Sequence, residues 1–141
     1  MRYMGLDIGD RWIGVAISDP SGILASPLTI IKRKQEAADI EAIGDIIKQN
    51  DIGRVIVGLP RSLNGSLGRQ AEKVQQFTDN LRLHILIPVE FRDERLTTVS
   101  ARSLMQETVP RKKRQKARDD AIAAAIILQG FLDEEQSQSH C

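Results

Sequence analysis

The chain has few of the residues that bind soft metals or form covalent cross-links. Its 141 residues include one cysteine, the terminal Cys141, and two histidines, His84 and His140. One cysteine excludes an intramolecular disulfide, and so few thiols and imidazoles make a structural zinc site implausible. Neither histidine has a catalytic partner nearby in the sequence.

Long apolar runs and strong net charge are also missing. No stretch of about 18 apolar residues is present, and the N-terminus lacks the pattern of a secretory signal, so a cytoplasmic location is expected. The formal net charge is +1, and 41% of the residues are hydrophobic. These values fit one soluble domain over residues 1–132, followed by a polar tail, 133–141, that is expected to be disordered.

The period of the hydrophobic residues changes along the chain from two residues, typical of strands, to 3.6 residues, typical of helices. The first part predicts an antiparallel meander of three strands, with Pro27 in the third indicating an edge position or a bulge. The second part predicts helices alternating with buried parallel strands. The expected elements are strands Arg2–Ile8, Trp12–Ser18 and Ile23–Ile31, a helix Glu36–Gln49, a strand at 55–57, a helix around 71–81, a strand Ile85–Phe91, a short helix around 99–105 and a helix Asp120–Leu132. We therefore predict an α/β fold: a mixed sheet with helices on both faces.

Asp7 is an acidic residue within the first, otherwise apolar strand. Burying a carboxylate without a partner costs several kcal/mol, roughly. A carboxylate in such a strand is therefore a candidate metal ligand.

Two further acidic positions are candidates for the same site. Glu94 follows the strand Ile85–Phe91, where ligands gather beyond the carboxyl ends of parallel strands; alternatively, Asp93 and Glu94 cap the next helix. Asp120, with Asp119 beside it, precedes an alanine-rich run that allows close packing on the sheet. The alternative for this pair is a helix start stabilised by the dipole, worth roughly 0.3–1 kcal/mol.

Three converging carboxylates would repel one another, and divalent cations remove that repulsion. Oxygen ligands suit Mg²⁺ or Mn²⁺, and paired ions of this kind catalyse in-line phosphodiester chemistry. The hypothesis is a metal site formed by Asp7, Glu94 and one residue of the pair Asp119–Asp120.

Four motifs together resemble the YqgF family, also called RuvX, of RNase H-like nucleases. They are Gly5-Leu6-Asp7-Ile8-Gly9 with Arg11 and Gly14-Val15-Ala16, Val57-Gly58-Leu59-Pro60 with Asn64-Gly65-Ser66, Asp93-Glu94-Arg95-Leu96-Thr97-Thr98, and Asp120-Ala121-Ile122-Ala123-Ala124. The resemblance covers nearly the whole chain, in order. It implies an RNase H-like fold, an acidic triad of Asp7, Glu94 and Asp120, and trimming of the 16S ribosomal RNA precursor or, by similarity to RuvC, Holliday junction resolution.

Two segments are expected to contact nucleic acid. The loop 59–68 offers Arg61, Asn64 and Ser66 on the sheet edge that holds the acidic sites, although a plain strand–helix connection is the alternative. The segment 110–118 concentrates positive charge, which is often only a solvated face but here would bind a polyanion. Its basic residues are Arg111, Lys112, Lys113, Arg114, Lys116 and Arg118. Aromatic residues make up only 4% of the chain, so Trp12 is expected to be a packing residue.

Other readings remain open at this point. An actin- or hexokinase-like phosphotransferase also begins with an Asp-x-Gly hairpin but needs two such domains. A non-catalytic RNA-binding or ribosome-assembly adapter would keep the fold without turnover. Junction resolution calls for two paired active sites, hence a dimer, whereas trimming of an RNA end does not; the chain is expected to be a monomer or a homodimer, without a membrane partner.

Overall fold

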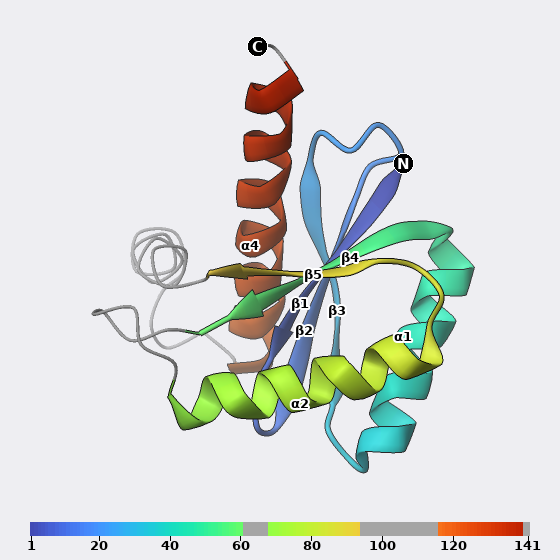
Figure 1. Ribbon diagram of the computed structural model, residues 1–141, viewed down its shortest axis with the longest axis vertical. Helices are drawn as coiled ribbons and strands as arrows, with labels where there is room; N and C mark the ends of the chain where they lie inside the picture. Colours follow the sequence, from blue (N-terminus) through green and yellow to red (C-terminus); the bar gives the residue numbers. More distant parts are fainter. Residues whose placement is uncertain (61–67, 94–115, 140–141) are drawn as a thin grey trace.

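A five-stranded mixed sheet forms the centre of the molecule, with helices on both faces (Figure 1). The computed structural model describes residues 1–60, 68–93 and 116–139; side chains at 116–120 and 137–139 are not described. Its elements are β1 (Arg2–Ile8), β2 (Trp12–Ser18), β3 (Ala25–Lys32), α1 (Glu36–Asn50), β4 (Ile52–Leu59), α2 (Arg69–His84), β5 (Val89–Asp93) and α4 (Lys116–Ser139).

The strand order is β3-β2-β1-β4-β5. The pairs β1–β2 and β2–β3 are antiparallel, and the pairs β1–β4 and β4–β5 are parallel. The predicted meander followed by parallel strands is thereby confirmed. The parallel strands β1, β4 and β5 end on the same side of the sheet, toward the lower left of Figure 1.

The edge position of β3 confirms what Pro27 predicted. Pro27 pairs with Ala16, and the β2–β3 register shifts between Val15 and Ala16. Proline has no backbone N–H to donate to a neighbouring strand, and an edge strand with an irregular register accommodates it.

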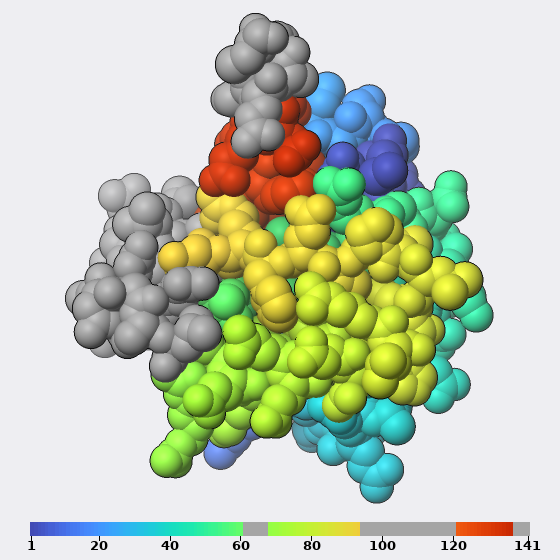
Figure 2. Space-filling model, viewed as in Figure 1, coloured from blue at the N-terminus to red at the C-terminus, as the bar shows by residue number. Residues whose placement is uncertain are grey.

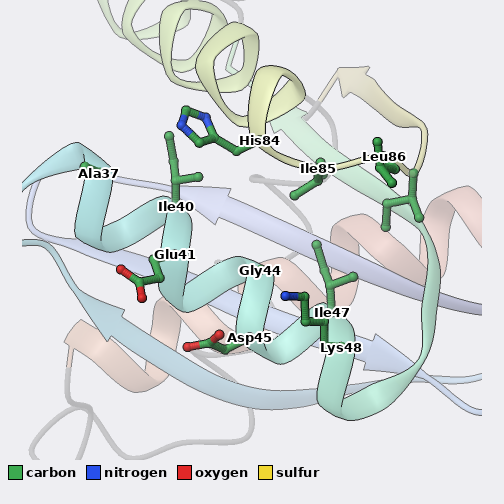
Figure 3. A pocket seen from close by; sticks show the side chains of 11 residues that line it. Ala37, Ile40, Glu41, Gly44, Asp45, Ile47, Lys48, His84, Ile85 and Leu86 are labelled. Atoms are coloured by element: carbon green, nitrogen blue, oxygen red, sulfur yellow. The ribbon is translucent and has the colours of Figure 1, made fainter.

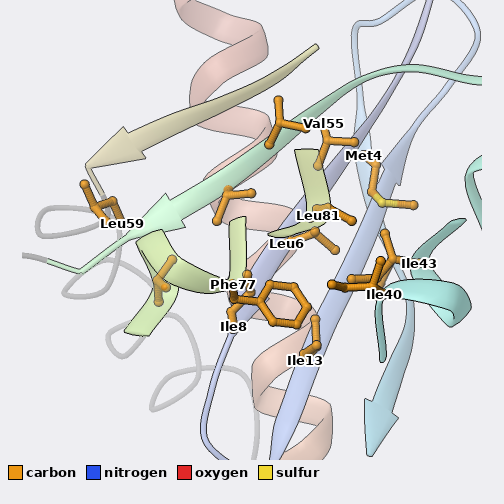
Figure 4. Packing of buried hydrophobic residues seen from close by; sticks show 14 of the residues in the cluster. Met4, Leu6, Ile8, Ile13, Ile40, Ile43, Val55, Leu59, Phe77 and Leu81 are labelled. Carbon is orange, nitrogen blue, oxygen red and sulfur yellow. The ribbon is translucent and has the colours of Figure 1, made fainter. Parts of the chain in front are cut away.

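The two faces of the sheet have separate hydrophobic cores. The larger core packs β1, β2, β4 and β5 against α1 and α2, with Phe77, Leu81, Ile40 and Ile43 as helix side chains (Figure 4). The other face packs against α4 and combines alanines such as Ala16 and Ala124 with larger residues such as Leu128 and Phe131. In Figure 2, the near surface is largely α2 and the segment that leads into β5, with α1 below and to the right. Small side chains on the second face let α4 approach the sheet closely.

Several predicted boundaries differ from the structure, most of all those of the last strand and the last helix. The last strand spans Val89–Asp93 rather than Ile85–Phe91, because the backbone N–H of Ile85 still caps α2 by donating to Leu81 and pairing with β4 begins at Pro88, whose carbonyl accepts from Val55. The last helix runs from Lys116 to Ser139, beyond both ends of the predicted Asp120–Leu132.

The helix predicted around 99–105 lies outside the described residues. Among the helices that the structure describes, none is long and apolar enough to span a membrane.

Candidate functional site

Asp7 lies on the face of β1 that is covered by α4. Met4, Leu6 and Ile8 point into the larger core, beside α1 and α2. Side chains of a strand alternate between faces, so Tyr3, Gly5 and Asp7 occupy the opposite face. Asp7 is partly exposed, in contrast to its fully buried neighbour Leu6. The strand therefore places the carboxylate on the second face without burying it completely.

Glycines flank Asp7 on both neighbouring strands. On β2, Gly14 pairs with Asp7. On β4, the parallel register pairs Leu6 with Val57, and one further step sets Asp7 beside Gly58. Both glycines are buried and have no side chain, so neither adjacent strand places a side chain directly beside the carboxylate.

Close contact between β1 and α4 fixes the relative position of these elements. A Cβ atom added to Gly5 would lie 2.8 Å from the Ala124 carbonyl oxygen and 2.8 Å from Leu128 Cβ. The rings of Tyr3 and Phe131 have centroids 5.7 Å apart. Tyr3 thus lies against Phe131, and Gly5, further along β1, lies against Ala124, which is nearer the start of α4.

The other predicted triad residues are only partly described. β5 ends at the exposed Asp93, and Glu94 lies immediately outside the described residues. Asp119 and Asp120 belong to α4, one turn before Ala124, and their side chains are not described. The structure thus describes the carboxylate of Asp7 and the backbone that holds Asp120.

The predicted nucleic-acid contacts also fall largely outside the described residues. Lys116 and Arg118 lie in the first turns of α4, without described side chains. The remaining positions are outside: Arg61, Asn64, Ser66, Arg111, Lys112, Lys113 and Arg114.

A buried ion pair supports the turn that follows Asp7, and sequence reasoning missed it. Arg33 Nη1 donates to the Gly9 carbonyl oxygen at 3.1 Å, and Arg33 Nε donates to Asp39 Oδ2 at 3.2 Å. The guanidinium also lies 5.0 Å from the Phe77 ring centroid. One side chain therefore connects the β1–β2 turn to α1 and α2. The spacing of these residues in the sequence does not indicate the contact, because they come from four separate segments of the chain.

No group of three potential metal ligands occurs among the described residues, where Asp7 is the one member of the predicted triad with a described side chain. A pocket of about 700 Å³ with apolar and charged lining residues lies elsewhere, between α1 and the segment that joins α2 to β5 (Figure 3). It is lined by Ala37, Ile40, Glu41, Gly44, Asp45, Ile47, Lys48, His84, Ile85, Leu86 and Ile87. This pocket faces the starting end of β5, away from the strand ends near Asp7.

Comparison of the sequence with protein families gives a match over almost the whole chain. The model of the RuvX family, described as Holliday junction resolvase, matches residues 1–134. A protein of Clostridium botulinum (strain Hall) is 48% identical over 134 residues, which cover 94% of this chain and 97% of that protein. One of Moorella thermoacetica is 47% identical over 133 residues, covering 94% and 95%. Both carry the name "Putative pre-16S rRNA nuclease".

Comparison with solved structures identifies the fold. RuvC of Thermus thermophilus in complex with a Holliday junction has a TM-score of 0.62 at 13% identity, covering 97% of this chain and 96% of that one. The fowlpox virus resolvase with its junction DNA has a TM-score of 0.56 at 13% identity, covering 96% and 99%. The predicted RNase H-like fold is thereby confirmed.

Proposed function

The chain belongs to the RuvX family, and from that membership we propose that it is a metal-dependent nuclease that matures the 5′ end of pre-16S ribosomal RNA. The relatives that are 47–48% identical carry that substrate in their names. The structural observation that supports a nuclease site is the close contact of β1 with α4 at Gly5 and Ala124.

Equal steps along the two elements support the pairing of Asp7 with Asp120. Two residues of a strand advance about 6.6 Å, and four residues of a helix advance about 6 Å. Gly5 lies against Ala124, so one further step leads from Gly5 to Asp7 on β1 and from Ala124 to Asp120 on α4. We infer that these two carboxylates face the same space.

The position of β5 supports Glu94 as the third member. β4 separates β5 from β1, so the two strands are about 10 Å apart, two strand spacings. Leu59 pairs with Asp93, the residue that precedes Glu94. Glu94 directly follows Asp93 in the sequence, and we propose that its long side chain completes the site.

The chemistry of these residues fits a hard cation. The proposed donors are carboxylate oxygens, the ligands that Mg²⁺ and Mn²⁺ prefer. When bound, such an ion supplies charge stabilisation for the phosphodiester and a more acidic water. The glycines beside Asp7 leave its carboxylate accessible, Asp120 contributes from the helix, and Glu94 orients the attacking water.

The remaining parts of the proposal concern binding and assembly. Loop 59–68 and the basic segment 110–118 would hold the sugar–phosphate backbone without reading its sequence. Ribosomal particles would present the substrate in the cytoplasm. A monomer suffices for cutting one RNA strand.

Cleavage of two substrates in parallel tests this function. The full chain is incubated with a 16S precursor leader RNA and with a four-way DNA junction, in Mg²⁺, in Mn²⁺ and in excess chelator. We expect cutting of the RNA that depends on the metal. Symmetric cutting of the junction alone would favour junction resolution, which the family description names. If neither substrate is cut under any metal condition, the nuclease proposal fails and an assembly adapter becomes the better account.

A further inference from the structure

Trp12, the single tryptophan of the chain, is not a core residue. It begins β2, and its neighbour Ile13 is fully buried in the larger core. Alternation along the strand therefore puts Trp12 on the α4 face, where it stays partly exposed. Trp12 belongs to neither core cluster. Its backbone carbonyl accepts from the Gly9 N–H at 2.9 Å, whereas its indole ring forms no ring contact or hydrogen bond with the described residues. The expectation that it is a packing residue stays a prediction, since the structure leaves Trp12 half-buried.

The limited reach of the α4 core explains this exposure. The cluster between α4 and the sheet includes Tyr3, Ala16, Ala25 and Ile56, which lie on rows nearer the opposite end of β1 and β2. Trp12 lies beyond Gly14 in the other direction. The residues of this cluster, all within the part of the chain that the structure describes, thus leave Trp12 partly exposed.

Two residues of β3 lie on the same face as the partly exposed Trp12 and form a surface with it. Lys32 pairs with Trp12 and Ile30 pairs with Gly14, so both share the α4 face. Lys32 is exposed and makes no ion pair with the described residues. We call Trp12, Ile30 and Lys32 the Trp12 surface. It combines an aromatic ring, an aliphatic neighbour and an unneutralised cation.

The Trp12 surface adjoins Asp7. Asp7 pairs with Gly14, so Trp12 is its diagonal neighbour across the β1–β2 ladder, about 7–8 Å away on the same face. Gly14 has no side chain that could stand between them. A nucleic-acid strand with one phosphodiester at Asp7 would therefore place its next nucleotide at the indole ring of Trp12.

We propose that the Trp12 surface is a stacking subsite for an unpaired nucleotide next to the phosphodiester acted on at Asp7, and this inference rests on the proposed nuclease function. Every base has a π-face that stacks on an aromatic ring, and Lys32 neutralises the adjacent phosphate. A base inside a duplex already has both faces stacked on its neighbours. The subsite therefore selects single-stranded substrate over duplex.

Intrinsic fluorescence reads this contact directly, because Trp12 is the single tryptophan. The full chain is titrated, without divalent metal, with a single-stranded RNA and with the same sequence in a duplex, while fluorescence anisotropy of a labelled strand reports binding independently. We expect the single strand to quench Trp12 emission and the duplex to leave it nearly unchanged.

Substitutions separate stacking from general binding. Trp12→Phe keeps an aromatic face and should bind the single strand within about threefold of wild type. Trp12→Leu should bind it about 10- to 100-fold more weakly, the range of one lost base–aromatic stack. Leu86→Ala removes a fully exposed leucine far from Asp7 and should bind as wild type does. Circular dichroism of each variant confirms that it is folded.

The outcomes for the subsite and for the nuclease differ. If wild type binds the single strand without a change in Trp12 emission, and Trp12→Leu binds equally well, the stacking subsite is overturned and the nuclease proposal stands. Equal quenching by single strand and duplex would overturn the strand selectivity. If wild type binds neither the single strand nor the duplex, the proposed function fails, and the subsite fails with it.

Discussion

Gly5 decides how near α4 comes to the strand that carries Asp7. Its missing side chain leaves room that the Ala124 carbonyl and Leu128 fill at distances no Cβ atom would allow. The sequence contains this glycine within an apolar strand but does not say which helix it meets. The contact makes Gly5 a determinant of the site's geometry.

Gly5→Ala should lower the free energy of unfolding by about 1–3 kcal/mol, because the new methyl group must push α4 away from β1. Urea unfolding measures the change. Gly44→Ala is the matched control: nothing lies within 4 Å of the added Cβ, and Gly44 is inside α1, so stability should rise by about 0.5–1 kcal/mol. Equal effects of the two substitutions would contradict the close packing of α4.

Asp19 illustrates a carboxylate used for a turn rather than for chemistry. The backbone N–H groups of Leu24 and Ile23 donate to its Oδ1 at 3.0 and 2.8 Å, and these hydrogen bonds hold the pKa of Asp19 below its ordinary value. Because the folded pKa is the lower one, this contribution to stability is complete above the unfolded pKa of 3.8 and is lost as pH falls through the folded pKa.

Asp19→Asn should therefore be less stable than wild type near neutral pH, and the difference should shrink in acid. Urea unfolding at intervals from about pH 6 to about pH 2 measures the difference in stability, because Asp19 becomes protonated in both the unfolded and the folded state over this range. A difference that stays constant over this range would show that the charge of Asp19 plays no part in the turn.

At the scale of elements, Arg33 connects the β1–β2 turn with β3, α1 and α2. The Asp39 side chain is 3% exposed and also accepts a hydrogen bond from the backbone N–H of Lys34. Removing one partner of such a pair leaves the other charged and poorly solvated. The pair therefore stabilises the turn that follows Asp7.

Asp39→Asn should lower the free energy of unfolding by about 2–3 kcal/mol, since it removes the charge of the buried carboxylate that accepts hydrogen bonds from Arg33 Nε and the Lys34 N–H. Asp79→Asn is the control, because the Arg82–Asp79 pair is exposed and should contribute less than about 0.5 kcal/mol. Thermal or urea unfolding of both variants gives the comparison. Similar values for the two would mean that the buried pair is not an important support.

Periodicity predicted the order of the described elements, but their ends required the tertiary structure. Ile85 and Ile87 continue the apolar pattern of β5, yet they belong to the connection between α2 and the sheet. The polar residues after Leu132 suggested a tail, but they continue α4, where Glu134 pairs with Arg92 of β5. Contacts between distant residues decide such boundaries, and no local pattern reports them.

At the scale of the whole molecule, the sequence predicted which carboxylates to consider because each stands out from its surroundings. Asp7 interrupts an apolar strand, and Asp120 precedes an alanine-rich run. The sequence could not predict the exposure of Trp12. An aromatic residue at the start of a strand gives the same sequence pattern whether or not a helix covers it. Its exposure depends on where the α4 core ends.

Replacing Arg111, Lys112 and Lys113 with glutamine should weaken binding of single-stranded RNA mainly at low salt. Each lost phosphate contact should reduce the slope of log K against log salt by about 0.7. The rate at saturating RNA should change little, because these residues position the backbone. Binding titrations at several salt concentrations measure the slope, and an unchanged slope would show that the basic segment does not contact the substrate.

The central claim is that Asp7 is a metal-ligating catalytic residue, and single-turnover cleavage of the 16S precursor leader in Mg²⁺ or Mn²⁺ tests it most directly. Asp7→Asn should remain folded and lose about 10³-fold in rate, because a metal ligand contributes several kcal/mol to stabilising the transition state. Asp10→Asn is the control: Asp10 is three residues away, exposed, and paired with the exposed Lys73. It should cleave as wild type does. Cleavage by Asp7→Asn at the rate of Asp10→Asn would contradict the account.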